Sequence, residues 1–236
     1  MIKAILNRVR SLGENKSLNY KKSYSQTGED LIIKNVFDII GIRQPSYLDI
    51  GAHHPFYLNN TALFYETGSR GINIEPDPTL IKAFFQHRKE DVNLNIGISD
   101  QPGILDFYVI NNPVLNTFSK EEAENYHKEG DYHIVEEKKV KVDTVGSVLA
   151  EFRGGKFPEF LTIDAEGVDD IILKSIDFTN NYPIVICVET ISFSNSGKGQ
   201  KNLALIEFLK SSGYILFADT YINSIFVRTD RWLRQS

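Results

Sequence analysis

A short apolar stretch that runs directly into a glycine constrains the fold more than any other feature of this sequence. Residues 47–50 have the composition of a buried strand, and Gly51 begins a tight turn immediately after them. The pattern that follows predicts a short helix over residues 57–65 and a second strand over residues 71–75. Strand, turn, helix and strand make a βαβ unit, so we expect an α/β fold with a parallel sheet.

The predicted second strand ends in a carboxylate, Glu75. Ligands of open parallel sheets bind outside the carboxyl ends of the strands, where an acidic side chain can accept hydrogen bonds from ribose hydroxyls. The dinucleotide fingerprint requires two further glycines, but His53 and Phe56 occupy those positions and would crowd a pyrophosphate. S-adenosylmethionine presents only an amino-acid tail to this turn. The pattern therefore favours S-adenosylmethionine, although one glycine after an apolar strand is common in α/β proteins.

Composition describes an ordinary globular protein. With 236 residues, 42% of them hydrophobic, and a formal net charge of −5, the chain is expected to be one large domain and not a general nucleic-acid binder. A single cysteine excludes an internal disulfide. No apolar run reaches the length of a membrane span, and the N-terminus lacks the apolar core of a signal peptide. We therefore expect a cytoplasmic protein.

Two segments differ from the rest of the chain. Residues 1–23 predict a basic amphipathic helix over the first dozen residues, followed by a polar connector. That helix, residues 1–12, could contact another subunit, its own domain or an anionic membrane surface. Residues 24–236 are expected to form the main domain, with an insertion around residues 111–135. The insertion is polar and predicts a surface segment, although insertions of this length also shape substrate pockets.

The alternation of strand and helix continues in the second half, where two further apolar strands end in Asp164 and Glu189. The carboxyl ends of parallel strands meet at one edge, so these acids should converge with Glu75 and His54. Residues 190–201 predict a mobile loop that could act as a lid. A final antiparallel strand pair fits a seven-stranded methyltransferase sheet better than a dehydrogenase. Further elements are expected at residues 27–37 (a helix capped by Thr27), 79–89, 92–98, 104–110, 140–148, 202–209, 214–218 and 224–228.

Several motifs, in this order, resemble the FkbM family of S-adenosylmethionine-dependent methyltransferases. The resemblance covers about residues 24–228 and implies a class I, Rossmann-like α/β fold with a mostly parallel seven-stranded sheet and an antiparallel C-terminal strand pair. It also implies methylation of hydroxyl groups on sugars, polysaccharide precursors or natural products. The motifs are SQTGED at 25–30, LDIGAHHP at 48–55, NIEP at 73–76, NIGISD at 95–100, IDAEG at 163–167 and YINSIFV at 221–227.

The resemblance also assigns roles to individual residues. It implies that Asp49 and Gly51 contact the methionine tail of the cofactor, that Glu75 holds the ribose and that Asp164 faces the transferred methyl group. The strand end at Ile98 is expected to face the base. The sequence departs from the general class I pattern after Gly51, where two histidines and a proline replace small residues. The expected cofactor-binding residues are Gln26, Asp49, Gly51, Glu75, Ile98 and Asp164.

The expected chemistry needs few catalytic groups. A sulfonium methyl is already activated, so the enzyme must align the acceptor oxygen with it and draw the proton from the hydroxyl. His54, Asp164 and Glu189 are the candidate bases. His54 could instead be a structural residue that bonds the loop backbone. A divalent metal held by the two acids and a histidine is a second way to lower the hydroxyl pKa, although no metal site is expected from the sequence.

Two other classes of function share parts of this pattern. A nicotinamide-dependent oxidoreductase or epimerase would have the same first βαβ unit, and its preference for NAD over adenosylmethionine would distinguish it. A non-catalytic adenosylmethionine-binding module would bind the cofactor but methylate no acceptor. For an enzyme, the expected partner is a small-molecule or glycan acceptor, and no nucleic acid.

Overall fold

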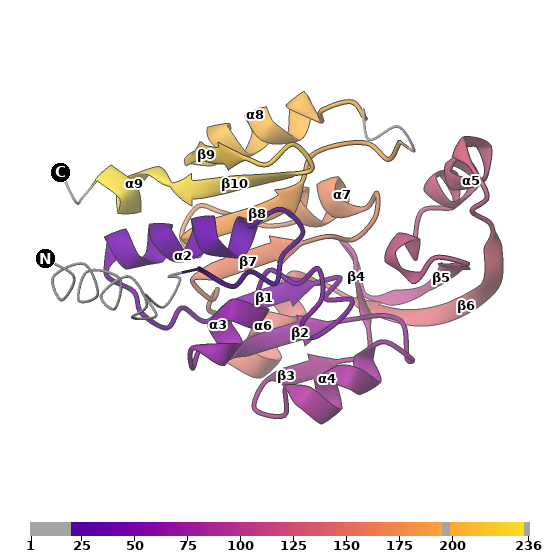
Figure 1. The fold of residues 1–236 in the computed structure, drawn as a ribbon, viewed down its shortest axis with the longest axis horizontal. Helices are drawn as coiled ribbons and strands as arrows, with labels where there is room; N and C mark the ends of the chain where they lie inside the picture. Colours follow the sequence, from indigo (N-terminus) through magenta and orange to yellow (C-terminus); the bar gives the residue numbers. More distant parts are fainter. Residues whose placement is uncertain (1–19, 195–198, 234–236) are drawn as a thin grey trace, which may run out of the picture.

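The computed structural model of the protein describes residues 20–194 and 199–233 (Figure 1). The amphipathic helix predicted for residues 1–12 lies outside these residues. Within the described part of the chain, no helix has both the length and the apolar composition needed to cross a bilayer.

A seven-stranded sheet with the order β3-β2-β1-β7-β8-β10-β9 forms the centre of the protein. Strands β3, β2, β1, β7 and β8 are parallel to one another, whereas β10 is antiparallel to both β8 and β9. The sheet and its antiparallel C-terminal pair confirm the predicted fold class. Its strands are β1 (Tyr47–Ile50), β2 (Gly71–Ile74), β3 (Val92–Leu94), β7 (Phe160–Ile163), β8 (Val185–Glu189), β9 (Tyr214–Asp219) and β10 (Asn223–Arg228).

Helices cover both faces of this sheet, which explains why β1 and β7 are buried at every position. The core on one face is completed by α6 (Val145–Arg153), α7 (Asp169–Lys174) and α8 (Leu203–Ser211). The core on the other face is completed by α2 (Glu29–Ile40), α3 (Ala62–Glu66) and α9 (Thr229–Trp232), while α4 (Ile81–His87) packs beside the turn after β1.

A smaller three-stranded sheet, with the order β4-β6-β5, forms an extension at the end of the molecule opposite α9 (Figure 1). The predicted insertion, residues 111–135, joins β5 to β6 and contains a 3₁₀ turn and a helix. The elements of the extension are β4 (Gly97–Ile98), β5 (Gly103–Ile110), η1 (Pro113–Leu115), α5 (Lys120–Glu129) and β6 (Ile134–Asp143).

Two predicted strands differ from the structure in extent. The strand expected over residues 92–98 is divided, because β3 pairs with β2 whereas β4 belongs to the smaller sheet. Between them, the Asn95 side chain donates to two backbone carbonyls of the turn after β2, at 2.9 Å each. The apolar pattern over residues 140–148 spans the end of β6 and the start of α6, where the Thr144 side chain accepts a hydrogen bond as the N-cap.

Two helix starts also differ from the prediction. The helix expected over residues 57–65 begins only with α3, because Asn59 folds the preceding chain into a turn by accepting a hydrogen bond from the Thr61 backbone at 3.0 Å. Thr27 is not the N-cap of α2. Gly28 takes that position with a φ of 92°, and no side chain of the described residues caps the helix.

Candidate functional site

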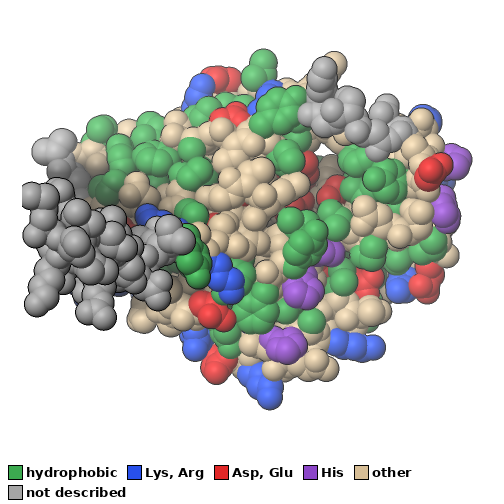
Figure 2. All heavy atoms as spheres, viewed as in Figure 1, with side chains coloured by type: hydrophobic (Ala, Val, Ile, Leu, Met, Phe, Trp, Pro, Cys, Tyr) green, Lys and Arg blue, Asp and Glu red, His purple; other side chains and the backbone are tan. Residues whose placement is uncertain are grey.

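A cavity of about 320 Å³ opens at the carboxyl ends of β1, β7 and β8. Its walls also include the loop before α2, the insertion, and the turn between β9 and β10. Figure 2 shows a recess between the main body and the extension, with acidic side chains inside it. The side chains at its base are Asp49, Asp164, Glu166 and Glu189.

Gly51 allows the turn after β1 to cross directly over the end of β7. Its φ is 76°, and an added Cβ would lie 1.8 Å from the carbonyl oxygen of Asp164. The Gly51 backbone N–H donates to Ile74 at 3.0 Å, and the Asp164 backbone N–H donates to Ile50 at 3.0 Å. This close contact fixes the ends of β1, β2 and β7 relative to one another.

Asp49 lies almost fully buried beneath this turn. Its Oδ2 accepts hydrogen bonds from Asn59 Nδ2 at 3.0 Å and Thr61 Oγ1 at 2.7 Å. Oδ1 makes no hydrogen bond with the described residues, and Asp49 lines the cavity. Burial raises the pKa of Asp49, and the guanidinium of Arg88 opposes this effect. One carboxylate oxygen is therefore held by the protein while the other is available to a ligand.

Glu75 lies in a narrower cavity that shares Gly51, Asp164 and Glu166 with the first. Its two carboxylate oxygens accept hydrogen bonds from the backbone N–H groups of His53 at 2.9 Å and Asp77 at 2.8 Å. Burial raises the pKa of Glu75 to about 7, although these hydrogen bonds stabilise the charged form. The apolar walls of this cavity include Ile98, Phe107 and Phe118.

Three carboxylates gather where β7 and β8 end. Oxygen atoms of Asp164, Glu166 and Glu189 all lie within 4.8 Å of one another. Glu166 accepts a hydrogen bond from Tyr126 Oη at 2.7 Å, whereas the other two carboxylates have no partner among the described residues. Desolvation inside the cavity raises the pKa of all three, and neighbouring carboxylates raise it further. This carboxylate cluster can hold a proton near neutral pH or attract a cation.

Glu166 was not among the predicted site residues. It is held with a φ of 49° in the turn after β7, where its carbonyl accepts a hydrogen bond from Thr117 Oγ1 at 2.5 Å. The predicted metal alternative used a histidine as the third ligand, but the structure places Glu166 in that position. Three carboxylates supply the oxygen ligands that Mg²⁺ prefers. The available sequence signal was an acid two residues after Asp164, the predicted end of the strand.

His54 lines neither cavity. Its Nδ1 accepts a hydrogen bond from the Phe56 backbone at 3.1 Å, and its ring meets Tyr57 edge-on. The predicted placement of His54 beside the two strand-end acids is therefore wrong, and the geometry matches the structural alternative. His53 lines both cavities instead, and its φ of 53° turns the loop toward them.

The structure brings the other predicted residues to the two cavities. Gln26, Asp49, Gly51, Asp164 and Glu189 line the first, and Gly51, Glu75, Ile98 and Asp164 line the second.

The predicted lid and the insertion meet beside the first cavity. The described part of the loop over residues 190–201 lines that cavity, and its Phe193 packs against Tyr126 with ring centroids 4.6 Å apart. Val114 and Leu115 of the insertion line the same cavity. The insertion is therefore part of the pocket wall and not only a surface segment.

Glu29 connects two walls of the first cavity. Its carboxylate is fully buried and accepts hydrogen bonds from the Thr27 backbone at 2.8 Å, Thr220 Oγ1 at 2.7 Å and Asn223 Nδ2 at 3.1 Å. Thr27 follows the cavity residue Gln26, and Asn223 itself lines the cavity. Burial would raise the pKa of Glu29, but hydrogen bonds from Thr27 and Thr220 lower it to about 2.

We expect Glu29→Gln to lower the free energy of unfolding by on the order of 3 kcal/mol at pH 7. The pKa in the folded state is depressed, so this stabilisation is complete above the unfolded pKa of about 4.5 and is lost as pH falls toward about 2. Urea unfolding between pH 7 and pH 3 should therefore show a shrinking difference from wild type. Glu151→Gln, on the exposed face of α6, is the control. A difference independent of pH would contradict the role of the Glu29 charge.

Comparison with known proteins shows the family. The model of the methyltransferase FkbM domain matches residues 49–216. A methyltransferase FkbM from Methylobacillus flagellatus is 11% identical with a TM-score of 0.43, and the match covers 91% of this chain and 46% of that one. A TehB-like SAM-dependent methyltransferase from Corynebacterium glutamicum is 13% identical with a TM-score of 0.40, and the match covers 96% of this chain and 97% of that one.

The chain thus spans about half the length of the Methylobacillus structure that it matches. None of the curated proteins matches this chain. The family model covers well over half of the sequence and runs from β1 to β9, across the strands that carry both cavities. The chain therefore belongs to the FkbM methyltransferase family.

Proposed function

We propose that this protein transfers a methyl group from S-adenosylmethionine to a hydroxyl oxygen of a small-molecule or glycan acceptor. The observation that carries this proposal is the convergence of four strand-end acids on two adjoining cavities. These acids are Asp49 of β1, Glu75 after β2, Asp164 after β7 and Glu189 of β8. Membership of the FkbM family supports methyl transfer as the reaction.

The residues present fit the cofactor. The free Oδ1 of Asp49 can accept a hydrogen bond from the ammonium group of the methionine tail. The carboxylate oxygens of Glu75 keep lone pairs that can accept hydrogen bonds from the ribose hydroxyls. Ile98, Phe107 and Phe118 offer an apolar wall to the adenine. Adenosylmethionine is cationic at its sulfonium and ammonium groups, which suits these acidic cavities.

The same cavities do not suit a dinucleotide. Their lining within the described part of the chain contains several carboxylates and no Lys or Arg. A pyrophosphate would therefore face like charges without a cation to offset them. This observation supports adenosylmethionine over NAD, and it agrees with the absence of the second and third fingerprint glycines.

The cofactor would supply a methyl group already activated by its sulfonium. The chain must then orient the acceptor oxygen and take up its proton. Asp164 lines both cavities, so it lies where the two substrates would meet. Its raised pKa, caused first by desolvation inside the cavity and then by the carboxylate of Asp169, suits a base that works near neutral pH. We assign Asp164 as the base, with Glu166 and Glu189 sharing the proton.

The acceptor would enter through the outer part of the first cavity. There the insertion contributes Val114, the loop after β8 contributes Phe193, and the turn between β9 and β10 contributes Tyr221. Apolar and aromatic surfaces of this kind can pack against the C–H faces of a sugar ring or a natural product. The resemblance to FkbM enzymes favours these acceptor classes.

Binding of adenosylmethionine to Glu75→Gln tests the cofactor assignment. We expect the Kd, measured by calorimetry, to rise by roughly ten- to a hundred-fold, because charge-assisted hydrogen bonds to the ribose hydroxyls are lost. Glu151→Gln on the exposed face of α6 should leave the Kd unchanged.

An unchanged Kd in the folded Glu75→Gln variant would contradict the assignment. Binding of NAD by the wild-type protein in place of adenosylmethionine would favour an oxidoreductase. Binding of adenosylmethionine without transfer of its labelled methyl group to any sugar or natural-product hydroxyl would favour a non-catalytic module.

A further inference from the structure

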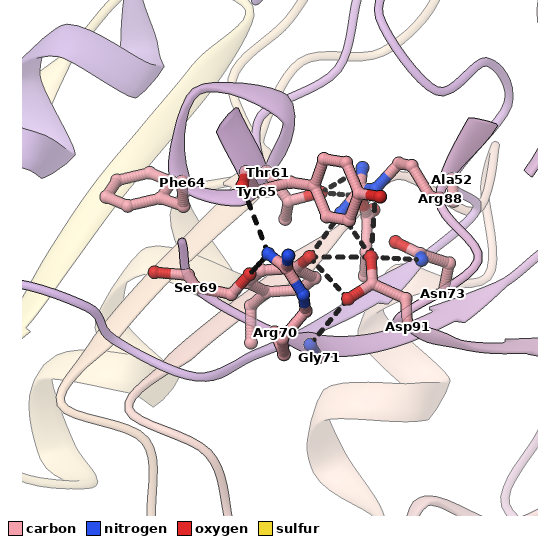
Figure 3. A network of polar contacts seen from close by, with 12 residues as sticks. Ala52, Thr61, Phe64, Tyr65, Ser69, Arg70, Gly71, Asn73, Arg88 and Asp91 are labelled. Carbon is pink, nitrogen blue, oxygen red and sulfur yellow. Dashed lines mark hydrogen bonds and ion pairs between the residues drawn. The ribbon is translucent and has the colours of Figure 1, made fainter. Parts of the chain in front are cut away.

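Arg88, at the C-terminal end of α4, is a fully buried cation that lines neither cavity. Its guanidinium contacts Asp91 Oδ2 at 2.9 Å (Figure 3). It also donates to Tyr47 Oη at 2.6 Å. A buried charge is strongly unfavourable unless it is paired, and Asp91 supplies the counter-charge. This pair uses Nε and Nη2 of the guanidinium.

The third guanidinium nitrogen of Arg88, Nη1, lies on the side of Asp49. Nη1 donates to Thr61 Oγ1 at 2.9 Å and to Asn59 Oδ1 at 3.2 Å. These same two side chains donate to Asp49 Oδ2, from Oγ1 and Nδ2. Two parallel hydrogen-bond relays, one through Thr61 and one through Asn59, therefore connect Arg88 to Asp49.

The direction of both relays follows from the chemistry of arginine. A guanidinium has only donors, so each side chain must turn its acceptor oxygen toward Arg88. That leaves the Thr61 hydroxyl hydrogen and the Asn59 amide N–H₂ group for Asp49. Because both donors bind Oδ2, the other oxygen of Asp49 is left for the cavity.

We propose that Arg88 is a positioning residue for the cofactor site, which acts through Asn59 and Thr61 to keep Asp49 charged and its Oδ1 directed into the cavity. The structural part of this proposal concerns the ligand-free protein. Its consequence for the methionine tail rests on the proposed function.

The charges around Asp49 show why a buried cation is needed. Burial raises the pKa of Asp49, and Arg88 lowers it. Asp91 also raises the pKa of Asp49, and the charge of Asp49 in turn raises the pKa of its neighbours Glu75 and Asp164. The negative charges of Asp49 and Asp164 also act on the buried thiol of Cys187, and its raised pKa leaves that thiol neutral. Arg88 is the cation that offsets these effects.

Three variants separate the relay from the ion pair. Thr61→Val removes one hydroxyl relay and leaves Arg88 beside Asp91. Arg88→Lys keeps a cation next to Asp91 but loses the forked donors to both relays, and it is less prone to unfold than a neutral replacement. Tyr47→Phe is the matched control, because the Tyr47 hydroxyl contacts Arg88 and Asp91 on the side away from Asp49.

The first measurement follows the Asp49 carboxyl by ¹³C NMR in the ligand-free protein, with the signal identified by its loss in Asp49→Asn. We expect the midpoint of its titration to move to higher pH by about one unit in Thr61→Val and Arg88→Lys, because the charged form loses a donor. The Tyr47→Phe midpoint should equal that of wild type. Equal midpoints in all four proteins would overturn the proposal.

The second measurement is the Kd for adenosylmethionine between pH 6 and pH 8.5. We expect binding up to roughly ten-fold weaker in Thr61→Val and Arg88→Lys at the low end of this range, with recovery as the pH rises and Asp49 ionises. Tyr47→Phe should keep the wild-type profile even if its unfolding midpoint falls, and the titration of the ligand itself is common to all variants. Weakening by the same factor at every pH would contradict the role of the Asp49 charge.

The two measurements test the proposed function and the role of Arg88 separately. If wild type does not bind adenosylmethionine, the proposed function fails while the carboxyl titration still decides the role of Arg88. If binding is normal and the titration is unaffected by Thr61→Val and Arg88→Lys, the proposed function stands and the relay does not.

Discussion

Replacement of Asp164 by asparagine is expected to lower turnover with the native acceptor by about a hundred- to ten-thousand-fold, the usual contribution of a general base. Asp164 lines both cavities and has no hydrogen-bond partner among the described residues, so its carboxylate is free to receive the acceptor proton. Single-turnover transfer of a labelled methyl group measures this loss directly. The cofactor Kd should also rise, because the variant changes the charge beside the methyl group.

Two variants make this prediction specific. Glu189→Gln should lower turnover and largely spare the cofactor Kd, since Glu189 lies outside the second cavity, where the ribose and the adenine would bind. Asp106→Asn, which removes an exposed ion pair with Lys139 on the smaller sheet, should change neither quantity. Turnover of Asp164→Asn within a few-fold of wild type would show that the base lies elsewhere.

Chelation distinguishes two uses of the same carboxylate cluster. A base mechanism predicts that EDTA leaves activity unchanged. Loss of activity in EDTA, with recovery in Mg²⁺ or Mn²⁺, would make Asp164, Glu166 and Glu189 metal ligands that lower the pKa of the acceptor hydroxyl.

Gly51→Ala is expected to have the largest effect on stability, a loss of about 3 to 5 kcal/mol in the free energy of unfolding. The added methyl group would lie 1.8 Å from the Asp164 carbonyl oxygen, and both partners of this clash are backbone. Relief requires the ends of β1 and β7 to separate. Urea unfolding measures the loss, and a folded variant should also bind adenosylmethionine more weakly.

Gly41→Ala is a closely matched control. Gly41 has a φ of 84°, similar to the 76° of Gly51, but an added Cβ there meets no atom of the described part of the chain within 4 Å. It should cost only about 1 to 2 kcal/mol from the left-handed backbone conformation. Equal losses in the two variants would show that backbone conformation, and not the contact with β7, sets the requirement for glycine at residue 51.

Much of the fold could be predicted because the sequence pattern and the sheet topology agree. The central strands are short, apolar and bounded by turn residues, and each of their acids falls at a carboxyl end. In a parallel sheet these positions share one edge, so Asp49, Glu75, Asp164 and Glu189 had to be neighbours. The smaller sheet was only partly foreseen, because the short β4 pairs with β6, where Gly97 lies opposite Val142, 45 residues later in the sequence.

The parts of the site that were missed depend on side-chain direction and long-range pairing. His54 lies in the turn shortly after β1, but the left-handed φ of His53 and the hydrogen bond to Phe56 direct it away from the cavities. Glu166 resembles an ordinary turn residue until Tyr126 of the insertion is placed beside it. Arg88 directly follows α4 and stands next to the exposed Lys89, and no local pattern marks it as buried.

The position of β10 has a consequence for synthesis of the chain. Although β10 is the last strand in sequence, it lies between β8 and β9 and not at the edge of the sheet. Until residues 223–228 leave the ribosome, β8 has one unpaired side, and four of its five residues are normally buried. Unprotected apolar strand edges pair with other chains. A polypeptide terminated before residue 223 should therefore aggregate, and the last strand to be made is the one that prevents this.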